Sequence, residues 1–166
     1  MSQEYILDGY NILNTVPELA RLLNNSLKEA RDQLKLEVEL YCKTSSVSVT
    51  IVYDSQTMPN QFDEYEDGAQ PLIVYTGANH TADEYIITRA EDAGNRSTTV
   101  VTDDRYIRES SVRSGCSVMQ PAEFYEFILK QNKGRPGRPP SQYQQDQLDR
   151  SEVEEWLSIF NSDDEE

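Results

Sequence analysis

Acidic residues follow short apolar runs at four places in this sequence of 166 residues. In an open parallel α/β sheet, ligands bind in the crevice outside the carboxyl ends of the strands, so acids at several strand ends would converge there. Clustered carboxylates raise one another's pKa unless a cation neutralises them, and their oxygen atoms suit Mg²⁺ or Mn²⁺. The pattern therefore predicts a metal site that cleaves phosphate esters. The acids are Asp8 after residues 5–7, Asp54 after 47–53, Asp83 after 72–75, and Asp103 with Asp104 after 99–102.

Local structure offers a second explanation for some of these positions. Asp83 falls in the first turn of an expected helix, where the positive end of the helix dipole favours a carboxylate without any ligand. Glu84 lies three residues after Thr81, so a capping box explains it better than metal binding, and a supporting role at the site is the alternative. Asp54 has three open roles: a metal ligand, a hydrogen-bond acceptor behind the ligands, or a turn residue at a strand end.

The segment Asp8-Gly9-Tyr10-Asn11 is the sharpest local signal. A glycine directly after the strand-end acid permits a tight turn, so Asp8 and Asn11 could both face one pocket. Asn11 would then ligate metal through its amide oxygen or orient a water molecule, and a plain turn is the alternative. His80 is the only histidine, and its place beside the Thr81 cap favours a surface or capping role over catalysis.

Strand and helix patterns alternate from residue 4 to about residue 130. β-branched residues mark a strand over 47–54, and apolar residues spaced three and four apart mark a helix over 27–42. Ser26 and Thr81 each precede a glutamate by three residues, as in a capping box. The alternation predicts a mainly parallel sheet covered by helices on both faces. Further strands are expected at 4–8, 71–75, 98–102 and 117–119, further helices from the Thr81 cap to 93 and at 105–113 and 121–130, and a solvated acidic loop at 63–68.

The composition changes near residue 132. Proline, glycine and basic residues, followed by polar residues, predict a linker over 132–150. Residues 151–166 begin with a capping-box pattern and carry the apolar stripe Val153, Trp156, Leu157 and Phe160 before an acidic tail. An isolated helix this short is marginal in water, so we expect it to dock on its own domain or on a protein partner. The chain then divides into a domain over 1–131, a linker and a short amphipathic helix.

The net charge of −15 limits the function classes. Strong acidity disfavours non-specific binding to nucleic acid, so an RNA substrate needs local basic patches, metal ions or a protein partner to hold it. No apolar stretch approaches the length of a membrane span, and the N-terminus lacks the pattern of a signal peptide, which predicts a cytoplasmic protein. Cys42 and Cys116 lack metal-ligand spacing and are expected to be free thiols.

Two groups of basic residues are candidates for RNA binding. Lys28, Arg31 and Lys35 recur at the spacing of one helical face. Arg105 and Arg108 follow the last acidic pair, where they could hold phosphate groups. Solvated helix faces often carry such residues, so an ordinary surface role is the alternative for each group.

Five segments in this order resemble a known family: Ile6-Leu7-Asp8-Gly9-Tyr10-Asn11, Glu29-Ala30-Arg31-Asp32, Val52-Tyr53-Asp54, Thr81-Ala82-Asp83-Glu84 and Val101-Thr102-Asp103-Asp104-Arg105. Together they resemble the YacP-like NYN ribonucleases, a branch of the PIN-domain-like nucleases, over about residues 4–130. The resemblance implies a PIN-like three-layer α/β/α sandwich with a mainly parallel sheet. It also implies a divalent-metal-dependent endoribonuclease that uses Mg²⁺ or Mn²⁺.

The resemblance further implies that Asp8, Asp83 and one acid of the last pair hold the metal. The family's third acid usually follows a serine and often precedes an arginine, which maps it onto Asp104 and leaves Asp103 as the alternative. The group includes a ribosome-associated endonuclease that acts on messenger RNA. RNA and the ribosome are therefore the partners that the resemblance implies.

Other functions fit the acids less well. A phosphatase with an aspartate nucleophile after the first strand needs a second acid two residues later, where this chain has Tyr10. A receiver-type domain needs paired acids after the first strand and a lysine after the last strand, and this sequence shows neither. A non-catalytic RNA- or ribosome-binding adaptor on a nuclease-like fold remains the alternative. Clustered acids argue against it, because negative charge gives an RNA binder no affinity.

Overall fold

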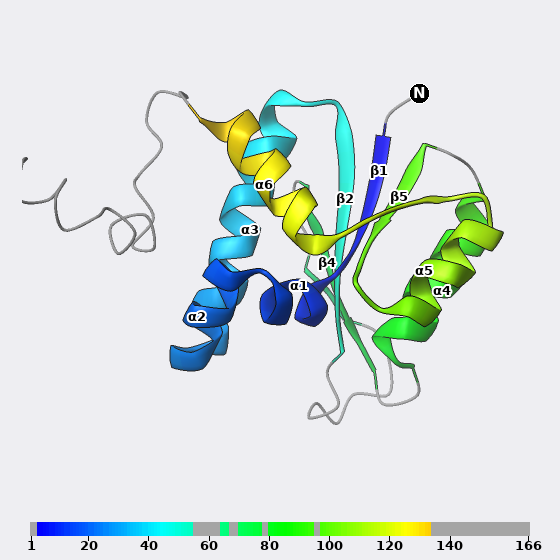
Figure 1. The fold of residues 1–166 in the computed structure, drawn as a ribbon, viewed down its shortest axis with the longest axis horizontal. Coiled ribbons are helices and arrows are strands. Elements are labelled where there is room, and N and C mark those ends of the chain that lie inside the picture. The colour runs from blue at the N-terminus through cyan, green and yellow to red at the C-terminus, as the bar shows by residue number, and fades with distance from the viewer. Residues whose placement is uncertain (1–2, 55–63, 67–69, 78–79, 95–96, 134–166) are drawn as a thin grey trace, which may run out of the picture. The chain divides into compact units, whose positions relative to one another are not determined.

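The computed structural model describes residues 3–54, 64–66, 70–77, 80–94 and 97–133, with the backbone alone for 64–66. These residues form a six-stranded sheet in the order β3-β4-β2-β1-β5-β6, drawn with its helices in Figure 1. All neighbouring strands are parallel except β3 and β4, so the expectation of a mainly parallel α/β sheet is confirmed. The strands are β1 (Gln3–Asp8), β2 (Val47–Asp54), β3 (Glu64–Glu66), β4 (Leu72–Thr76), β5 (Thr98–Val101) and β6 (Ser117–Met119).

The prediction of a solvated loop over 63–68 is wrong in its middle. Residues 64–66 form β3, which pairs antiparallel with β4 at the edge of the sheet. Its sequence Glu-Tyr-Glu places charges on an edge strand, a pattern that discourages further strand pairing. Acidity alone therefore did not distinguish a charged edge strand from a loop. Residues 63, 67 and 68 of that segment lie outside the described residues.

Four helices cover one face of the sheet. They are α1 (Gly9–Thr15), α2 (Pro17–Asn25), α3 (Leu27–Thr44) and α6 (Pro121–Asn132). Their core includes Leu7, Leu34, Ile51 and Phe124, all fully buried. The sequence analysis expected no helix between residues 9 and 26, and α1 and α2 correct that. Both helices are short, and Pro17 starts α2 at the first helical position, which proline favours.

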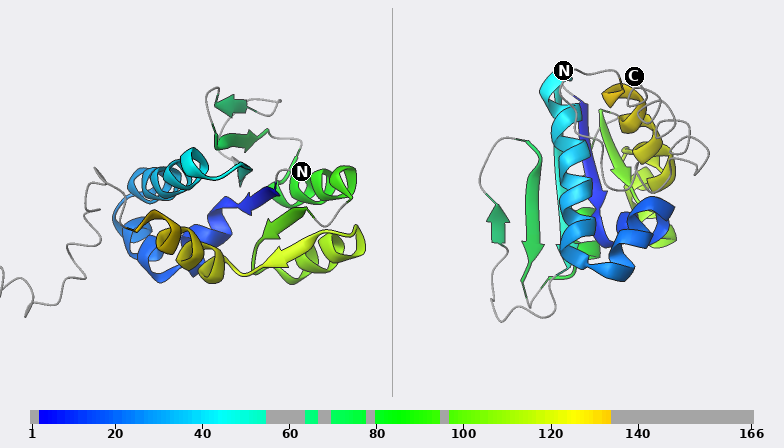
Figure 2. Two further views of the ribbon diagram at one scale, coloured as in Figure 1. Left: turned by 90° about the horizontal axis from the view of Figure 1, so that it is seen from above. Right: turned by 90° about the vertical axis from the view of Figure 1, so that its left-hand side faces the viewer.

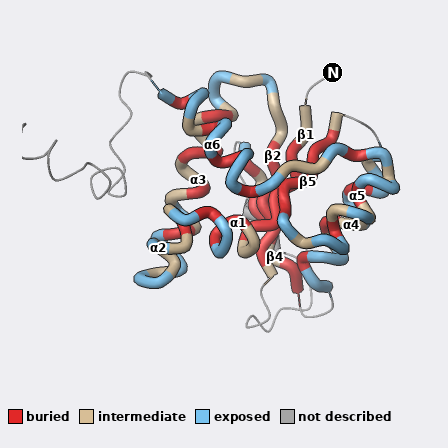
Figure 3. The backbone as a smooth tube through the Cα atoms, viewed as in Figure 1, coloured by how far each residue is buried: buried red, intermediate tan, exposed pale blue. Residues whose placement is uncertain are grey.

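Two helices, α4 (Ala82–Ala93) and α5 (Arg105–Arg113), cover the other face. Their core contains Ile6, Val52, Ile86 and Ile107. Figure 2 shows the helices on the two sides of the sheet, and Figure 3 shows that buried residues concentrate on the strands between them. The expected α/β/α sandwich is confirmed for this domain. None of the helices within the described ranges has the length and hydropathy that a membrane span requires.

Local signals set most helix ends correctly. The Thr81 side chain accepts a hydrogen bond from the Glu84 backbone, and the Glu84 carboxylate accepts one from the Thr81 backbone, which completes the expected capping box. Ser26 caps α3 by accepting from the Glu29 N–H at 3.2 Å. Helix α4 ends at Gly94, whose φ of 50° lies in the left-handed region that glycine adopts at low cost. The predicted linker and C-terminal helix lie outside the described residues, apart from residues 132 and 133.

Candidate active site at the carboxyl ends of the strands

Strand alternation directs Asp8 and Asp54 to the face covered by α4 and α5. Side chains two residues apart in a strand point to the same face. Ile6, two residues before Asp8, and Val52, two residues before Asp54, both belong to the core under these two helices. Asp8 and Asp54 are the last residues of β1 and β2, so both lie at the carboxyl edge of the sheet.

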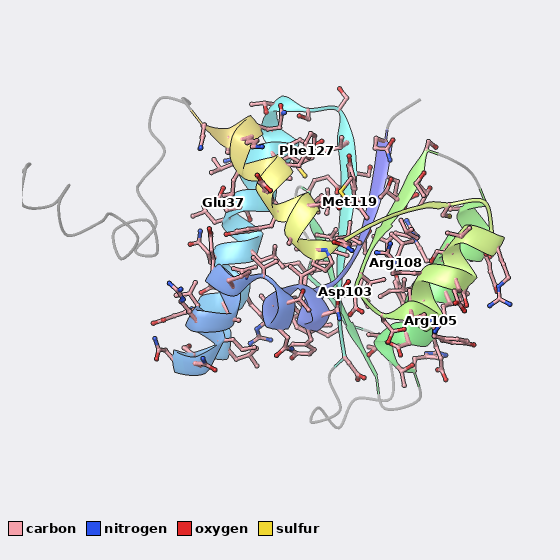
Figure 4. The ribbon with its side chains drawn as sticks, viewed as in Figure 1. Glu37, Asp103, Arg105, Arg108, Met119 and Phe127 are labelled. Atoms are coloured by element: carbon pink, nitrogen blue, oxygen red, sulfur yellow. The ribbon has the colours of Figure 1, made fainter. Side chains whose placement is uncertain are left out.

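The two helices on that face bring further acids to the same edge. Asp83 lies in the first turn of α4, and Asp104 is the N-cap residue of α5. Both helices follow a strand directly or after a short connection, so their N-termini lie where the parallel strands end. Figure 4 shows Asp103 and Arg105, which flank Asp104 in the sequence, at this end of the sheet.

Asp8 is the buried acid of the group, with 8% of its surface exposed. Its pKa is raised from 3.8 to about 6, mainly by burial and then by the charges of Asp83 and Asp104, against the hydrogen bond from the Thr102 hydroxyl, which lowers it. The Asn11 N–H lowers the pKa slightly, without forming a capping hydrogen bond. No cation is among the groups that act on this pKa. Asp8 is therefore mostly ionised near neutral pH, beside two further carboxylates that repel its charge.

Asp83 links all four acids electrostatically. Its pKa is raised by partial removal of its carboxylate from water, then by the charges of Asp104, Asp54 and Glu84. Because Asp83 and Asp104 also raise the pKa of Asp8, these four acids lie near enough along this edge of the sheet to act on one another through Asp83. Glu84 is the capping-box residue of α4 and adds negative charge nearby.

Asp103 and Asp104 have different environments although they are neighbours. Asp104 is partly buried, and its Oδ1 accepts a hydrogen bond from the Ile107 N–H at 3.0 Å. Asp103 is exposed and is absent from the charges that raise the pKa of Asp8 and Asp83. Of the two neighbours, Asp104 is thus the one whose charge acts on Asp8 and Asp83.

Thr102 connects these acids, and the sequence analysis did not single it out. Its buried hydroxyl donates to Asp8 Oδ2 at 2.9 Å and accepts from the Asp104 N–H at 3.1 Å. Its carbonyl oxygen accepts from Arg108 Nη1 at 3.1 Å. A threonine between a strand and two acids was visible in the sequence, but only the fold shows that its hydroxyl faces Asp8.

The Asn11 side chain joins two segments at this edge of the sheet. Its Oδ1 accepts a hydrogen bond from the Asp103 backbone N–H at 2.8 Å, which connects α1 to the segment between β5 and α5. The amide oxygen proposed as a metal ligand is thus engaged with the backbone. Asn11 thus connects the start of α1, next to the carboxyl end of β1, to the segment that follows β5.

The described residues contain no group of three or more His, Cys, Asp or Glu side chains already arranged to hold a metal ion. The donors still suit a divalent cation, because they supply carboxylate oxygens of uncompensated charge. Asp83 is exposed in the first turn of its helix, where rotation of the side chain can change its distance from Asp8. The residues fit Mg²⁺ or Mn²⁺ in charge and chemistry, and the carboxylates need to move closer to share an ion.

The basic candidates are distributed over two regions. Arg105 is exposed and pairs with Glu109 at 2.9 Å on α5, while Arg108 supports Thr102 (Figure 4). Lys28, Arg31 and Lys35 lie on α3, which covers the opposite face of the sheet from α4 and α5. His80 is exposed before the cap of α4. Cys42 and Cys116 are free thiols, as expected.

Gly9 permits a close approach rather than an unusual turn. It begins α1 with an ordinary backbone conformation, since Gly94 and Gly115 are the described glycines with positive φ. A Cβ atom at Gly9 would clash with the Tyr53 ring and would lie 2.9 Å from the Val52 carbonyl oxygen. The absence of a side chain therefore lets α1 start against β2, which keeps Asp8 at the strand end.

We expect Gly9→Ala to destabilise the protein by about 1–3 kcal/mol, the usual cost of overpacking a core. Urea unfolding would measure the loss. In a Tyr53→Leu background, which removes the ring, the same Gly9→Ala change should cost less, because contacting residues are not additive. Equal costs in both backgrounds would contradict the contact.

Comparison with known proteins identifies relatives of this chain in sequence and in fold. The chain is 30% identical over 95 residues to the uncharacterized protein YacP of Bacillus subtilis (strain 168), an alignment that covers 57% of this chain and 55% of that protein. The chain thus matches about half the length of this curated relative. The crystal structure of Rae1 (YacP) from Bacillus subtilis matches with a TM-score of 0.63 at 25% identity, covering 95% of this chain and 91% of that chain.

The crystal structure of a mutant form of the same Bacillus subtilis protein matches with a TM-score of 0.62 at 26% identity, over 77% of each chain. A model of the YacP-like NYN domain matches residues 5–161. That match extends beyond the residues 4–130 over which the motifs resemble the family. This chain therefore belongs to the YacP-like NYN domain family.

Proposed function

We propose that this protein is a divalent-metal-dependent endoribonuclease, which cleaves phosphodiester bonds of RNA. One observation carries the proposal: at the carboxyl edge of the sheet, the buried carboxylate of Asp8 lies close enough to Asp83 and Asp104 for their charges to raise its pKa, and Asp104 and Asp54 act on Asp83 in the same way. Such a cluster costs stability unless a ligand compensates it. Membership of the family adds a nuclease-like fold.

In this proposal Asp8, Asp83 and Asp104 hold Mg²⁺ or Mn²⁺, with Asp54 beside them. A bound metal activates water, polarises the phosphoryl oxygen and neutralises developing charge. The protein's own contribution is to fix the acids. Thr102 orients the Asp8 carboxylate, and the α5 backbone holds one oxygen of Asp104 and leaves the other available.

RNA must approach a chain with a net charge of −15. Basic side chains near the site and the metal itself are the groups that attract a phosphate backbone. We propose Arg105 as one such group, because it is exposed at the start of α5 and its surface ion pair with Glu109 contributes little energy. Action on messenger RNA at the ribosome and a cytoplasmic location belong to the same proposal.

A cleavage assay tests this function directly. Full-length protein is incubated with labelled single-stranded RNA at increasing concentrations of Mg²⁺ or Mn²⁺, and the products are separated by length. We expect internal cleavage that rises with metal concentration and stops when chelator is added, because the acids alone cannot stabilise a phosphate transition state. Undiminished cleavage in chelator would contradict the mechanism, and shortening from one end alone would contradict the endonuclease assignment.

A further inference from the structure

A basic and aromatic pocket lies on the α3 face of the sheet, apart from the acids. Its volume is about 210 Å³, and its lining includes Lys28, Arg31 and Lys35 from α3 with Tyr53 and Tyr75 from β2 and β4. Drug-sized ligands occupy pockets of roughly 300–1,000 Å³, so this pocket suits a smaller group such as one nucleotide. Figure 2 shows that β3 and β4 extend past α3 on this side of the domain.

The rings of Tyr53 and Tyr75 and the guanidinium group of Arg31 lie against one another. Tyr53 and Tyr75 are stacked, with ring centroids 5.7 Å apart and an angle of 22° between their planes. The Arg31 guanidinium carbon lies 5.9 Å from the Tyr53 centroid and 5.8 Å from the Tyr75 centroid. Tyr53 is 1% exposed and Tyr75 is partly exposed. Tyr53 therefore forms the back of the pocket, and Tyr75 with Arg31 presents planar surface to a ligand.

The charge of the lining favours an anion. Among the described residues of the lining, three side chains are cationic and one, Asp32, is a carboxylate. Lys28 pairs with Asp32 at 2.8 Å, but both side chains are exposed, at 80% and 60%. Exposed ion pairs contribute little energy, so Lys28 can exchange this partner for a phosphate. In an acidic protein, the positive charge of these described side chains would attract an RNA phosphate.

The pocket and the acids lie at neighbouring positions of the same strand. Tyr53 and Asp54 are consecutive at the end of β2, so their Cα atoms are about 3.8 Å apart, while their side chains point to opposite faces. The ring of Tyr53 also packs against that of Tyr10, with 5.1 Å between their centroids, and Tyr10 lies two residues after Asp8. One RNA strand that crosses the sheet edge would thus meet both the acids and this pocket.

We propose that this pocket binds one nucleotide of the single-stranded RNA substrate, close to the cleaved phosphate. The base lies against Tyr75 and Arg31, and Lys28 and Lys35 hold the phosphate. Aromatic rings and arginine planes stack on unpaired bases without strong sequence preference, which suits a subsite that retains RNA rather than one that selects sequence. This inference names the substrate contact of the nuclease proposed above, and it rests on that proposal for the identity of the ligand.

Fluorescence anisotropy with a labelled single-stranded RNA oligonucleotide in chelator tests the pocket, because binding is then measured without metal-dependent cleavage. Tyr75→Ala should raise the Kd by about 5- to 150-fold, whereas Tyr75→Phe should bind like the unaltered protein, since the ring remains. Lys35→Gln should weaken binding and lower the slope of log Kd against log salt by about 0.7, the value for one lost phosphate contact on a single strand.

Lys43→Gln is the matched control, because Lys43 is an exposed lysine of α3 in its last turn and does not line the pocket. It should change neither the Kd nor the salt slope beyond a small fraction of the effect at Lys35. Thermal unfolding of each variant separates lost binding from lost folding. If Tyr75→Ala fails to fold, Tyr75→Leu and Lys35→Gln carry the test, because they keep the volume or alter a charged head group alone.

The outcomes separate the pocket from the nuclease activity. RNA binding by Tyr75→Leu and Lys35→Gln that equals the binding of Lys43→Gln would overturn the pocket, even if the protein cleaves RNA. An unaltered protein that does not bind RNA in chelator would overturn it as well. Weakened binding of the pocket variants, in a protein that never cleaves RNA with any metal, would support the pocket and reject the proposed nuclease.

Discussion

Replacing Asp83 with asparagine should lower the rate of metal-dependent RNA cleavage by about 10²–10³-fold, the usual cost of losing one group that stabilises a transition state electrostatically. Asp83 is exposed, and the capping box of α4 uses Thr81 and Glu84, so the folded structure should persist. The charge that is lost is the one coupled to both Asp8 and Asp104. Single-turnover cleavage with Mn²⁺ in excess would measure the effect.

Asp92→Asn is a matched control for this variant. Asp92 is an exposed aspartate of the same helix, near its other end, so the substitution makes the same change in net charge away from the site. Its cleavage rate should equal that of the unaltered protein. Loss of activity in both variants would mean that net charge, and not the site, limits the reaction.

The same assay decides between the last two acids. Asp104→Asn should reduce cleavage as Asp83→Asn does, while asparagine still serves as an N-cap for α5. Asp103→Asn should have a much smaller effect, because its side chain is exposed and its link to Asn11 runs through the backbone N–H. The reverse result would assign the third site acid to Asp103.

Replacing Asp8 with asparagine should stabilise the metal-free protein at about pH 7.5 by about 2 kcal/mol. Burial contributes most to raising the Asp8 pKa from 3.8 to about 6, and a shift of about two units corresponds to about 3 kcal/mol of destabilisation once the carboxylate is ionised. Asparagine keeps an oxygen that accepts from Thr102, and burying its additional N–H donors offsets about 1 kcal/mol of the gain. The melting temperature in chelator should rise by roughly 5–10 °C.

The stability gained by Asp8→Asn should depend on pH, because it comes from removing the ionised carboxylate. Between pH 3.8 and about 6 the folded protein holds the Asp8 proton more tightly than the unfolded chain does, so its stability falls as the pH rises through this window. The advantage of Asp8→Asn should therefore disappear below about pH 4 and be complete above about pH 7. An advantage that is constant with pH would show that the substitution acts through packing.

Bound metal should make the unaltered protein more stable than Asp8→Asn, the reverse of the order expected in chelator. Mn²⁺ that binds the folded site raises the melting temperature of the unaltered protein, with a stabilisation that grows with the logarithm of metal concentration above the Kd, and it should raise that of Asp8→Asn much less. Asp92→Asn should respond to the metal as the unaltered protein does. Equal stabilisation of all three proteins would place the metal elsewhere.

The sequence by itself determined the class of fold and the place of the acids. β-branched runs, capping residues and their alternation indicate parallel strands joined by helices, because these signals act over a few neighbouring residues. An acid at the end of such a strand, as at Asp8 or Asp54, then lies at the carboxyl edge in any fold of this class. The order of strands and helices along the sequence was sufficient to predict this position, and in the structure β1 ends at Asp8 and β2 ends at Asp54.

Tertiary structure decided which of two adjacent acids is partly buried and whether short segments form helices. Asp103 and Asp104 are adjacent in sequence, and the start of α5 partly buries Asp104 and leaves Asp103 exposed. The short helices α1 and α2 gain stability from packing on the sheet, because helices of this length are marginal by their own propensity. Helix α2 nevertheless carries local signals, Pro17 at its first position and an amphipathic pattern, which the sequence analysis did not use.

The contacts that shape both sites join residues far apart in the chain. The Thr102 hydroxyl lies beside Asp8 because β5 pairs with β1, and Arg31 lies over Tyr53 and Tyr75 because α3 packs on β2 next to β4. No local pattern encodes such a pair, since each depends on the order of strands and on the face that a helix covers. The sequence placed the acids at one edge, and only the packed sheet determined which side chains surround them.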